Sequence, residues 1–190
     1  MKKTIIIDVD GVLLNWKANL PFFMMQLGML DNLNINGSNT DTDARSLFIN
    51  VSDMQLGKLI GAYNEHECAK YIPAYEDAYD ALRELSDRYN IIALTKFSMS
   101  RTSWSNRVHN LNALFPGMIS EVISIEYFDS KAKYVEKLCE LHDVKYFIDD
   151  SLDNIREIQE RFDIECIHVN RVDDHFNALK TAIYTSSIFN

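Results

Sequence analysis

The sequence predicts an α/β fold, a Rossmann-like three-layer sandwich with a central parallel sheet of about five strands. Short runs rich in Ile, Val, Phe or Tyr are nearly continuous in apolar residues, which is typical of strands covered on both faces. Segments with apolar residues at helical spacing lie between these runs. Strands that alternate with helices imply right-handed βαβ crossovers.

Each predicted element follows from this patterning. The predicted strands are Thr4–Val9, Ile91–Thr95, Val122–Tyr127, Val144–Asp149 and Ile164–Val169. The predicted helices of the sandwich are Tyr75–Tyr89, Lys131–His142, Leu152–Phe162 and Asp174–Ile183. In these helices, apolar residues recur three or four positions apart, so one face of each can cover the sheet.

The segment between the first two strands breaks this alternation, because it is too long for a simple crossover. We therefore predict a core domain, residues 1–14 and 72–190, and a helical cap, residues 15–71. The cap is expected to contain helices at Leu20–Leu30, Ala44–Ile49 and Ser52–Ala69, with a polar loop at Asp31–Asp43. The alternative is an extra helical layer with no role in substrate binding.

Composition and charge limit the classes of partner. Of the 190 residues, 47% are hydrophobic and 25% are charged, which is ordinary for a soluble globular protein. The net charge of -9 argues against broad nucleic-acid binding, which needs a basic surface. Residues 15–72 hold four basic residues and six acids, so no extended nucleic acid is expected as a partner.

The cellular compartment can be predicted from the cysteines and the apolar stretches. The three cysteines are widely spaced and form no CxxC pair, which indicates a reduced protein rather than a disulfide framework. The apolar run at the start is interrupted by Asp8 and Asp10, unlike a signal peptide. The stretch Leu20–Leu30 is too short to span a bilayer. We expect a cytoplasmic protein without membrane association.

Two carboxylates follow the first strand. Asp8 and Asp10 stand two residues apart, and Gly11 lets the chain turn sharply after them. Ligands of a parallel α/β sheet bind at the carboxyl ends of its strands. Buried carboxylates are unfavourable unless they are paired or bind a metal. This pair is therefore a candidate catalytic site.

A second acidic cluster ends the fourth strand and continues into the next helix. Asp149, Asp150 and Asp153 would converge with the first pair at one edge of the sheet. A hard dication relieves the repulsion among these acids, and oxygen ligands suit magnesium. The alternative is that Asp150 or Ser151 only caps the following helix.

Two further strand ends carry polar side chains. Thr95 ends the second strand and is followed by Lys96, and its hydroxyl could hydrogen-bond a phosphoryl oxygen. Lys131 opens the helix after the third strand, where it could neutralise a nucleophile and a transferring phosphoryl group. Taken alone, Thr95 is weak evidence because threonine is common in strands, and Lys131 alone is better explained as a solvated lysine at a helix end.

The order of these motifs resembles the haloacid dehalogenase superfamily. The motifs are DxDGV at Asp8, a strand-end Thr95, a helix-opening Lys131 and an apolar strand that ends in Asp149-Asp150. The resemblance implies that Asp8 attacks phosphorus and that Asp10 is the general acid and base. It implies Mg²⁺ as cofactor, with Asp8, the Asp10 carbonyl and Asp150 as ligands.

This resemblance leaves two assignments open. Either Asp149 or Asp150 could be the metal ligand of the last motif, with Asp153 as a supporting acid. Either Lys131 or Lys133 could be the lysine that neutralises the phosphate. The cap lies where this family places a small helical cap, similar to the deoxyribonucleotidase-like branch. We expect Gly11, Lys96, Phe22 and Phe23 to contact the substrate; the alternative is that the cap's apolar residues pack its own core.

The sequence therefore predicts a magnesium-dependent phosphomonoesterase that works through an aspartyl-phosphate. A nucleoside monophosphate is the expected substrate, because apolar residues such as Trp16 and Phe22 could stack on a base. The alternatives are a phosphatase for sugar phosphates or other metabolites, a nucleic-acid end phosphatase, and a non-catalytic binding module. The sequence does not define the oligomeric state.

Overall fold

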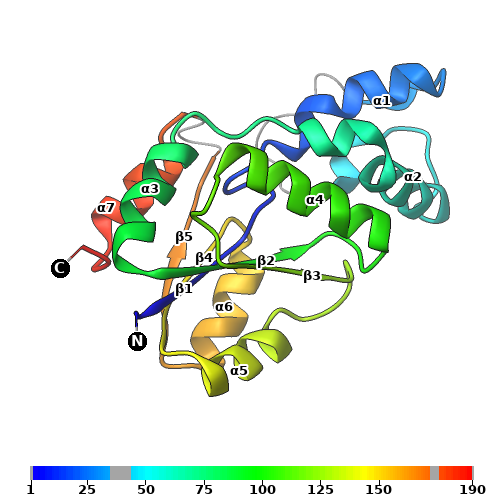
Figure 1. Ribbon diagram of the computed structural model, residues 1–190. Helices are drawn as coiled ribbons and strands as arrows, with labels where there is room; N and C mark the ends of the chain where they lie inside the picture. Colours follow the sequence, from blue (N-terminus) through cyan, green and yellow to red (C-terminus); the bar gives the residue numbers. More distant parts are fainter. Residues whose placement is uncertain (1, 35–43, 172–175, 190) are drawn as a thin grey trace.

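The computed structural model describes residues 2–34, 44–171 and 176–189, and it contains one parallel sheet (Figure 1). The strand order is β3-β2-β1-β4-β5, which confirms the predicted α/β class. The strands are β1 (Thr4–Ile7), β2 (Asn90–Lys96), β3 (Glu121–Ile125), β4 (Val144–Asp149) and β5 (Glu165–His168). The first strand thus lies at the centre, where residues that follow it reach the sheet edge between β2 and β4.

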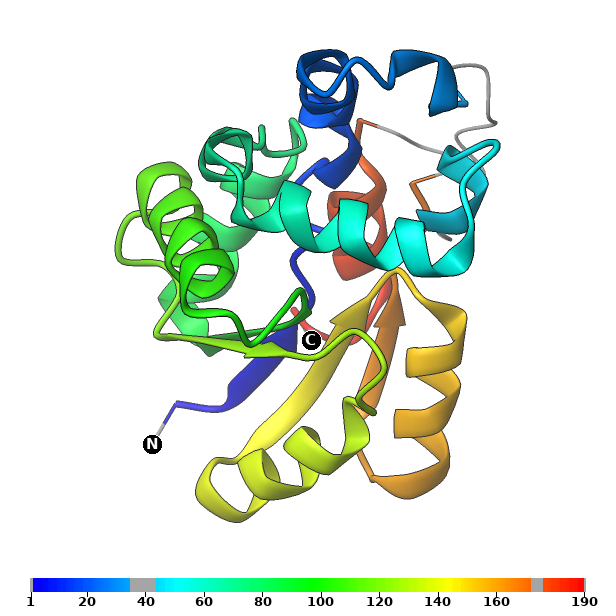
Figure 2. The same ribbon diagram turned by 90° about the vertical axis from the view of Figure 1, so that its right-hand side faces the viewer.

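Helices cover both faces of this sheet (Figures 1 and 2). The helices on one face are α5 (Ala132–Leu141) and α6 (Leu152–Arg161). The helices on the other face are α3 (Ala78–Arg88), α4 (Arg101–Leu114) and α7 (Ala178–Thr185). None of the described helices combines the length and apolar character needed to cross a membrane.

The central strand shows why its sequence is continuously apolar. Successive side chains of a strand point to opposite faces. Ile5 and Ile7 belong to the cluster packed beneath α3 and α7, whereas Ile6 belongs to the cluster beneath α5 and α6. All three are completely buried. Both layers therefore depend on β1, and the residues after Ile7 are held in place by a fully packed strand.

The helix α4 has no counterpart among the predicted elements. Its buried positions follow helical spacing, but only Leu111 among them is apolar. The others are the polar residues Ser103, Asn106, Arg107 and Asn110. A search for apolar periodicity therefore misses this helix. The last predicted helix, Asp174–Ile183, is observed as α7, and its expected first two residues lie outside the described part of the chain.

The predicted insertion after β1 is confirmed as helical, with shorter elements than expected. It contains α1 (Leu20–Gln26) and α2 (Asp53–Glu65), and short 3₁₀ helices at Trp16–Asn19, Leu30–Asn32, Ala44–Leu47 and Glu67–Tyr71. Ser52 caps α2 through a reciprocal capping box with Gln55. Most of the predicted loop Asp31–Asp43 lies outside the described residues.

Asparagine side chains join the end of the insertion to the core. Asn64 Nδ2 donates to the carbonyl of Phe97 at 3.0 Å, and Asn64 is almost fully buried. Asn106 Nδ2 donates to the carbonyls of Asn64 and His66 at 3.1 and 3.2 Å. Asn110 Nδ2 reaches the carbonyl of Ile72 at 3.0 Å. The polar face of α4 thus satisfies backbone groups where the insertion returns to the core.

Replacing Asn106 with Ala should lower the free energy of unfolding by about 1–3 kcal/mol, because the Asn64 and His66 carbonyls would each lose a hydrogen bond from this buried side chain. Urea denaturation followed by circular dichroism measures this change. Asn112→Ala is the matched control, because Asn112 lies on the exposed side of the same helix. Equal losses in both variants would contradict the anchoring role of Asn106.

Candidate active site

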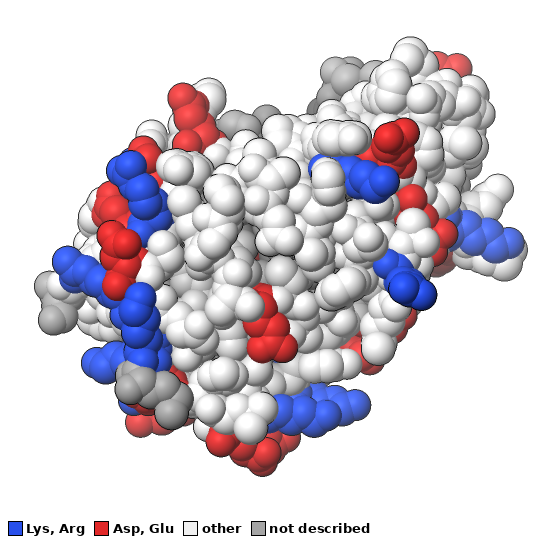
Figure 3. Space-filling model, viewed as in Figure 1, with Lys and Arg blue, Asp and Glu red and all other residues white. Residues whose placement is uncertain are grey.

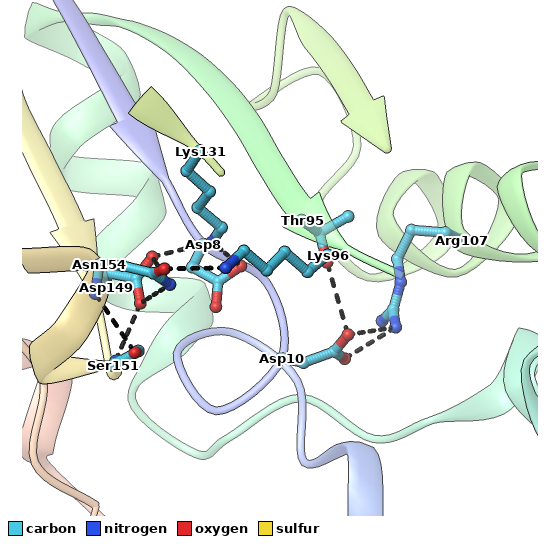
Figure 4. A network of polar contacts seen from close by, with 9 residues as sticks. All are labelled: Asp8, Asp10, Thr95, Lys96, Arg107, Lys131, Asp149, Ser151 and Asn154. Atoms are coloured by element: carbon cyan, nitrogen blue, oxygen red, sulfur yellow. Dashed lines mark hydrogen bonds and ion pairs between the residues drawn. The ribbon is translucent and has the colours of Figure 1, made fainter. Parts of the chain in front are cut away.

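Charged side chains converge at the carboxyl ends of the two central strands (Figure 4). Asp8 directly follows β1, Asp149 is the last residue of β4, and Lys131 precedes α5. The parallel pairing of β1 and β4 brings the two aspartates to the same edge. The predicted convergence of the first and fourth strand ends is thus observed.

Lys131 lies completely buried between two carboxylates. Its Nζ is 2.7 Å from Asp8 Oδ1 and 2.8 Å from Asp149 Oδ2. Although burial opposes its charge, Asp149 and Asp8 raise the pKa of Lys131, so it stays an ammonium. Lys133, the alternative lysine, is exposed on α5. The geometry therefore favours Lys131 as the cation of the site.

Asp149 and Asp150 have different surroundings. Asp149 Oδ1 accepts hydrogen bonds from the backbone N–H of Ser151 at 2.8 Å and from Asn154 Nδ2 at 3.0 Å. With Lys131 as well, its oxygens are engaged by protein donors. No side chain among the described residues hydrogen-bonds to the Asp150 carboxylate. Asp150 is therefore the better placed of the two to offer oxygens to a ligand.

Gly11 makes room for that carboxylate. Its backbone has φ +84°, and a Cβ built on it would lie 2.0 Å from Asp150 Oδ2. A side chain at this position would be strained and would displace Asp150. The absence of a side chain at Gly11 thus allows the Asp150 carboxylate to lie close to the turn after β1.

Three carboxylates form a group that could hold a metal ion. Oxygens of Asp8, Asp149 and Asp150 all lie within 4.8 Å of one another. Oxygen ligands of this kind fit Mg²⁺, which usually binds one or two carboxylates and keeps several waters. The side chain of Asp10 instead contacts Arg107, and that of Asp153 is 94% exposed. Neither joins this group through its carboxylate.

Two carboxylates of this group, those of Asp8 and Asp150, hold protons more tightly than free aspartate does. Burial raises the pKa of Asp8 to about 7, with Lys131 opposing the shift and Asp149 adding to it. Burial, followed by the charges of Asp8 and Asp149, raises the pKa of Asp150 well above its ordinary value. Without a bound metal ion, Asp8 is therefore partly protonated near neutral pH.

Asp10 is held by a residue that the sequence did not reveal. Both Asp10 oxygens lie 2.7 Å from Nη2 of Arg107, which comes from α4. The hydroxyl of Thr95, which is buried at the end of β2, donates to Asp10 Oδ2 at 3.5 Å. Burial raises the pKa of Asp10, and the Arg107 charge opposes that rise. Because α4 lacks an apolar stripe, its sequence gave no signal for Arg107.

A cavity of about 720 Å³ opens beside these groups, and Asp10, Gly11 and Asp150 line it. Its aromatic lining residues are Trp16, Tyr75, Phe97 and Tyr127, and its basic ones include Lys17, Lys96 and Arg171. Lys96 Nζ also hydrogen-bonds Asn154 Oδ1 at 3.1 Å. This volume is within the usual range for small-molecule sites, roughly 300–1,000 Å³.

The two phenylalanines predicted to contact substrate do not line this cavity. Phe23 is buried in the insertion, where its ring centroid lies 5.3 Å from those of Tyr63 and His66. Phe22 is 51% exposed. Trp16 lies in the cavity wall instead, and its indole N–H donates to Asn64 Oδ1 at 3.0 Å. The structure thus favours the alternative of core packing for Phe23.

Comparison with known sequences gives one informative relative. No protein-family model matches the chain. An uncharacterised 32.4 kDa protein from the Gp30–rIII intergenic region of Enterobacteria phage T4 is 36% identical over 152 residues. This match covers 79% of the present chain and 54% of the phage protein, so the chain spans about half the length of that relative.

Comparison with solved structures defines the fold. A haloacid dehalogenase-like hydrolase from Streptococcus pneumoniae matches with a TM-score of 0.61 and 13% identity, over 95% of this chain and 90% of that one. The HAD-hydrolase YfnB from Bacillus subtilis, bound to magnesium, matches at 0.56 and 14%, over 89% of each chain. L-2-haloacid dehalogenase from Xanthobacter autotrophicus, with chloropropionic acid covalently bound, matches at 0.58 and 14%, over 99% and 84%.

These similarities show the haloacid dehalogenase-like fold for this chain. Its five parallel strands and the helical insertion after β1 agree with that assignment. The low identities do not define a branch within the fold.

Magnesium should raise the melting temperature more at about pH 8 than at about pH 5, because ligand binding to the folded state competes with protons. The folded pKa values of Asp8 and Asp150 are raised. Without metal, the contribution of these two groups to the free energy of unfolding therefore falls as the pH rises above the pKa of an aspartate in the unfolded chain. For Asp8 this loss continues up to its folded pKa of about 7. Calorimetric scans with and without magnesium at the two pH values measure the difference.

The matched variants for this experiment are Asp150→Ala and Asp153→Ala. Asp150→Ala should shrink the magnesium response at the higher pH, because it removes a carboxylate of the group. Asp153→Ala should keep the response, because that side chain is exposed and outside the group. A full response in Asp150→Ala would place the metal elsewhere.

Proposed function

We propose that this protein is a phosphomonoesterase that forms an aspartyl-phosphate on Asp8, with Asp10 as its general acid and base. The observation that carries the proposal is the pairing of Asp8 with the buried Lys131, beside a second carboxylate only two residues along the chain. This arrangement brings a nucleophile, a cation and a proton carrier to one edge of the sheet, and Asp10 lines the cavity there.

In the first step, a carboxylate oxygen of Asp8 attacks phosphorus and the bond to the ester oxygen breaks. Asp10 donates its proton to the departing oxygen, which leaves as an alcohol. Lys131 stays charged, and it lies close enough to Asp8 to stabilise negative charge on the transferring phosphoryl group. The covalent intermediate divides one difficult displacement into two easier ones.

In the second step, Asp10 takes a proton from water, whose oxygen attacks the phosphorus of the aspartyl-phosphate. The Asp8 carboxylate is released with inorganic phosphate, and Asp10 ends protonated for the next cycle. Asp150 together with Asp8 would hold a magnesium ion, with Asp149 beside them in the same group, and the ion would supply charge neutralisation between the carboxylates and the phosphate. The magnesium in the YfnB structure supports this choice of ion.

The cavity supports a nucleoside monophosphate as substrate. Trp16, Phe97 and Tyr127 give it aromatic walls on which a base could stack. The hydrogen bond to Asn64 fixes the orientation of the Trp16 indole before a ligand arrives. On the face shown in Figure 3, basic side chains are scattered among acidic ones, which favours a small substrate over a polynucleotide. A sugar phosphate or another phosphorylated metabolite is the alternative.

Asp8→Asn should reduce phosphate release to background while the melting temperature stays close to that of the wild type. The amide has the same shape but is a poor nucleophile. Release of inorganic phosphate from 4-nitrophenyl phosphate and from a panel of nucleotides and sugar phosphates, with and without magnesium, measures the effect. Asp87→Asn, an exposed substitution on α3, is the control.

The same panel should include 2-chloropropionic acid, because a dehalogenase is among the structural neighbours. Phosphate release without chloride release is the expected outcome. Chloride release without phosphate release would contradict the phosphatase assignment. Phosphate release by Asp8→Asn at a tenth or more of the wild-type rate would instead contradict the role of Asp8 as nucleophile.

Trp16→Leu should raise KM for nucleoside monophosphates and leave KM for 4-nitrophenyl phosphate nearly unchanged. Loss of a stacked base contact corresponds to about 1–3 kcal/mol of binding free energy. Phe22→Leu is the matched control, because that ring is exposed and outside the cavity. Steady-state kinetics that show no difference between the two substrates would favour the sugar-phosphate alternative.

A further inference from the structure

The two side chains of the Arg107–Asp10 ion pair differ in their exposure to solvent. The Arg107 side chain is completely buried, whereas the Asp10 side chain is 23% exposed and lines the cavity. One guanidinium nitrogen, Nη2, lies 2.7 Å from both Asp10 oxygens. Arg107 thus holds the carboxylate from the side of α4 (Figure 4), and the same carboxylate belongs to a residue that lines the cavity.

The rest of the Arg107 guanidinium is poorly satisfied. Its Nε and Nη1 are buried and have no hydrogen-bond partner among the described residues. The Phe97 ring provides a cation–π contact, with its centroid 4.0 Å from the guanidinium carbon. Unpaired buried donors and a buried charge are unfavourable for folding. Stability alone therefore gives little reason to place an arginine here.

The helix that carries Arg107 is fixed on both sides of this residue. Asn106 donates to the carbonyls of Asn64 and His66, and Asn110 donates to that of Ile72. These contacts restrain α4 within one turn of Arg107. The guanidinium is therefore presented by a rigid element rather than by a loop, as accurate positioning requires.

We propose that Arg107 is a positioning residue that fixes the direction in which the Asp10 carboxylate faces the cavity. This inference rests on the proposed function, in which Asp10 exchanges a proton with the leaving oxygen and with water. The Thr95 hydroxyl gives only a long contact of 3.5 Å to Asp10 and cannot replace Arg107 in this role. Arg107 does not line the cavity, so its effect on catalysis passes through Asp10.

The kinetic test uses Arg107→Met and Arg107→Lys with 4-nitrophenyl phosphate and magnesium. Arg107→Met should lower kcat by about tenfold to a hundredfold, as expected when a catalytic group is misplaced, with little change in KM. Arg107→Lys should recover part of kcat, because it restores a cation near Asp10. A loss confined to KM would overturn the proposal, and so would an unchanged kcat in Arg107→Met.

The combination with Asp10→Asn separates positioning from other effects. If Arg107 acts through Asp10, adding Arg107→Met to Asp10→Asn should lower kcat no further. A further loss as large as that in the wild-type background would overturn the proposal. Asn110→Ala removes a buried hydrogen bond from the same helix face and should lower the melting temperature while retaining kcat. An equal loss of kcat in Asn110→Ala would reduce Arg107 to a structural role.

A spectroscopic measurement keeps this inference distinct from the proposed function. In the wild type, the Arg107 side-chain N–H groups should give resolved, slowly exchanging NMR signals, assigned by their absence from Arg107→Lys. These signals should shift or broaden in Asp10→Asn. Averaged signals in the wild type would overturn the positioning proposal whatever the activity. Resolved signals in a protein that releases no phosphate would overturn only the phosphatase assignment.

Discussion

The ion pairs of the buried Lys131 determine how the rest of the site is arranged. Asp8 and Asp149 come from different strands, and each lies within 2.8 Å of the same ammonium. Without that cation, two buried carboxylates at one sheet edge would repel each other. The Asp149 carboxylate accepts hydrogen bonds from Lys131, from the backbone of Ser151 and from Asn154. Lys131, Ser151 and Asn154 together thus leave Asp150 as the carboxylate most available to a ligand.

A second cation, Arg107, binds the Asp10 carboxylate at the other side of the site. Arg107 holds Asp10 away from the group of three carboxylates, so Asp8 and Asp10 face different partners although only one residue separates them. This separation suits a pair in which one group attacks and the other exchanges protons. In the proposed mechanism, a lysine before α5 and an arginine within α4 would therefore keep the two roles apart.

The sheet and the strand-end residues could be predicted because their signals are local. The apolar runs predict five strands, and the polar residues just after them must lie at one edge of a parallel sheet. Arg107 could not be predicted in this way, because α4 buries polar side chains. Phe22 and Phe23 were both predicted to contact substrate, but consecutive apolar residues in α1 do not reveal which side faces the core. Only the packed structure shows that Trp16, rather than either phenylalanine, lines the cavity.

The attachment of the insertion to the core has a consequence for how selectivity could evolve. Asn64 joins α2 to Phe97 and to Trp16, so the frame around the cavity is braced from both sides. Ile60, one turn earlier on α2, lines the same cavity but belongs to neither the carboxylate group nor the brace. Changes in the size of this side chain would therefore alter which ligands fit the cavity, while Asp8 and Asp150 keep their places. Such a division would let related chains accept different ligands while keeping the same carboxylate group.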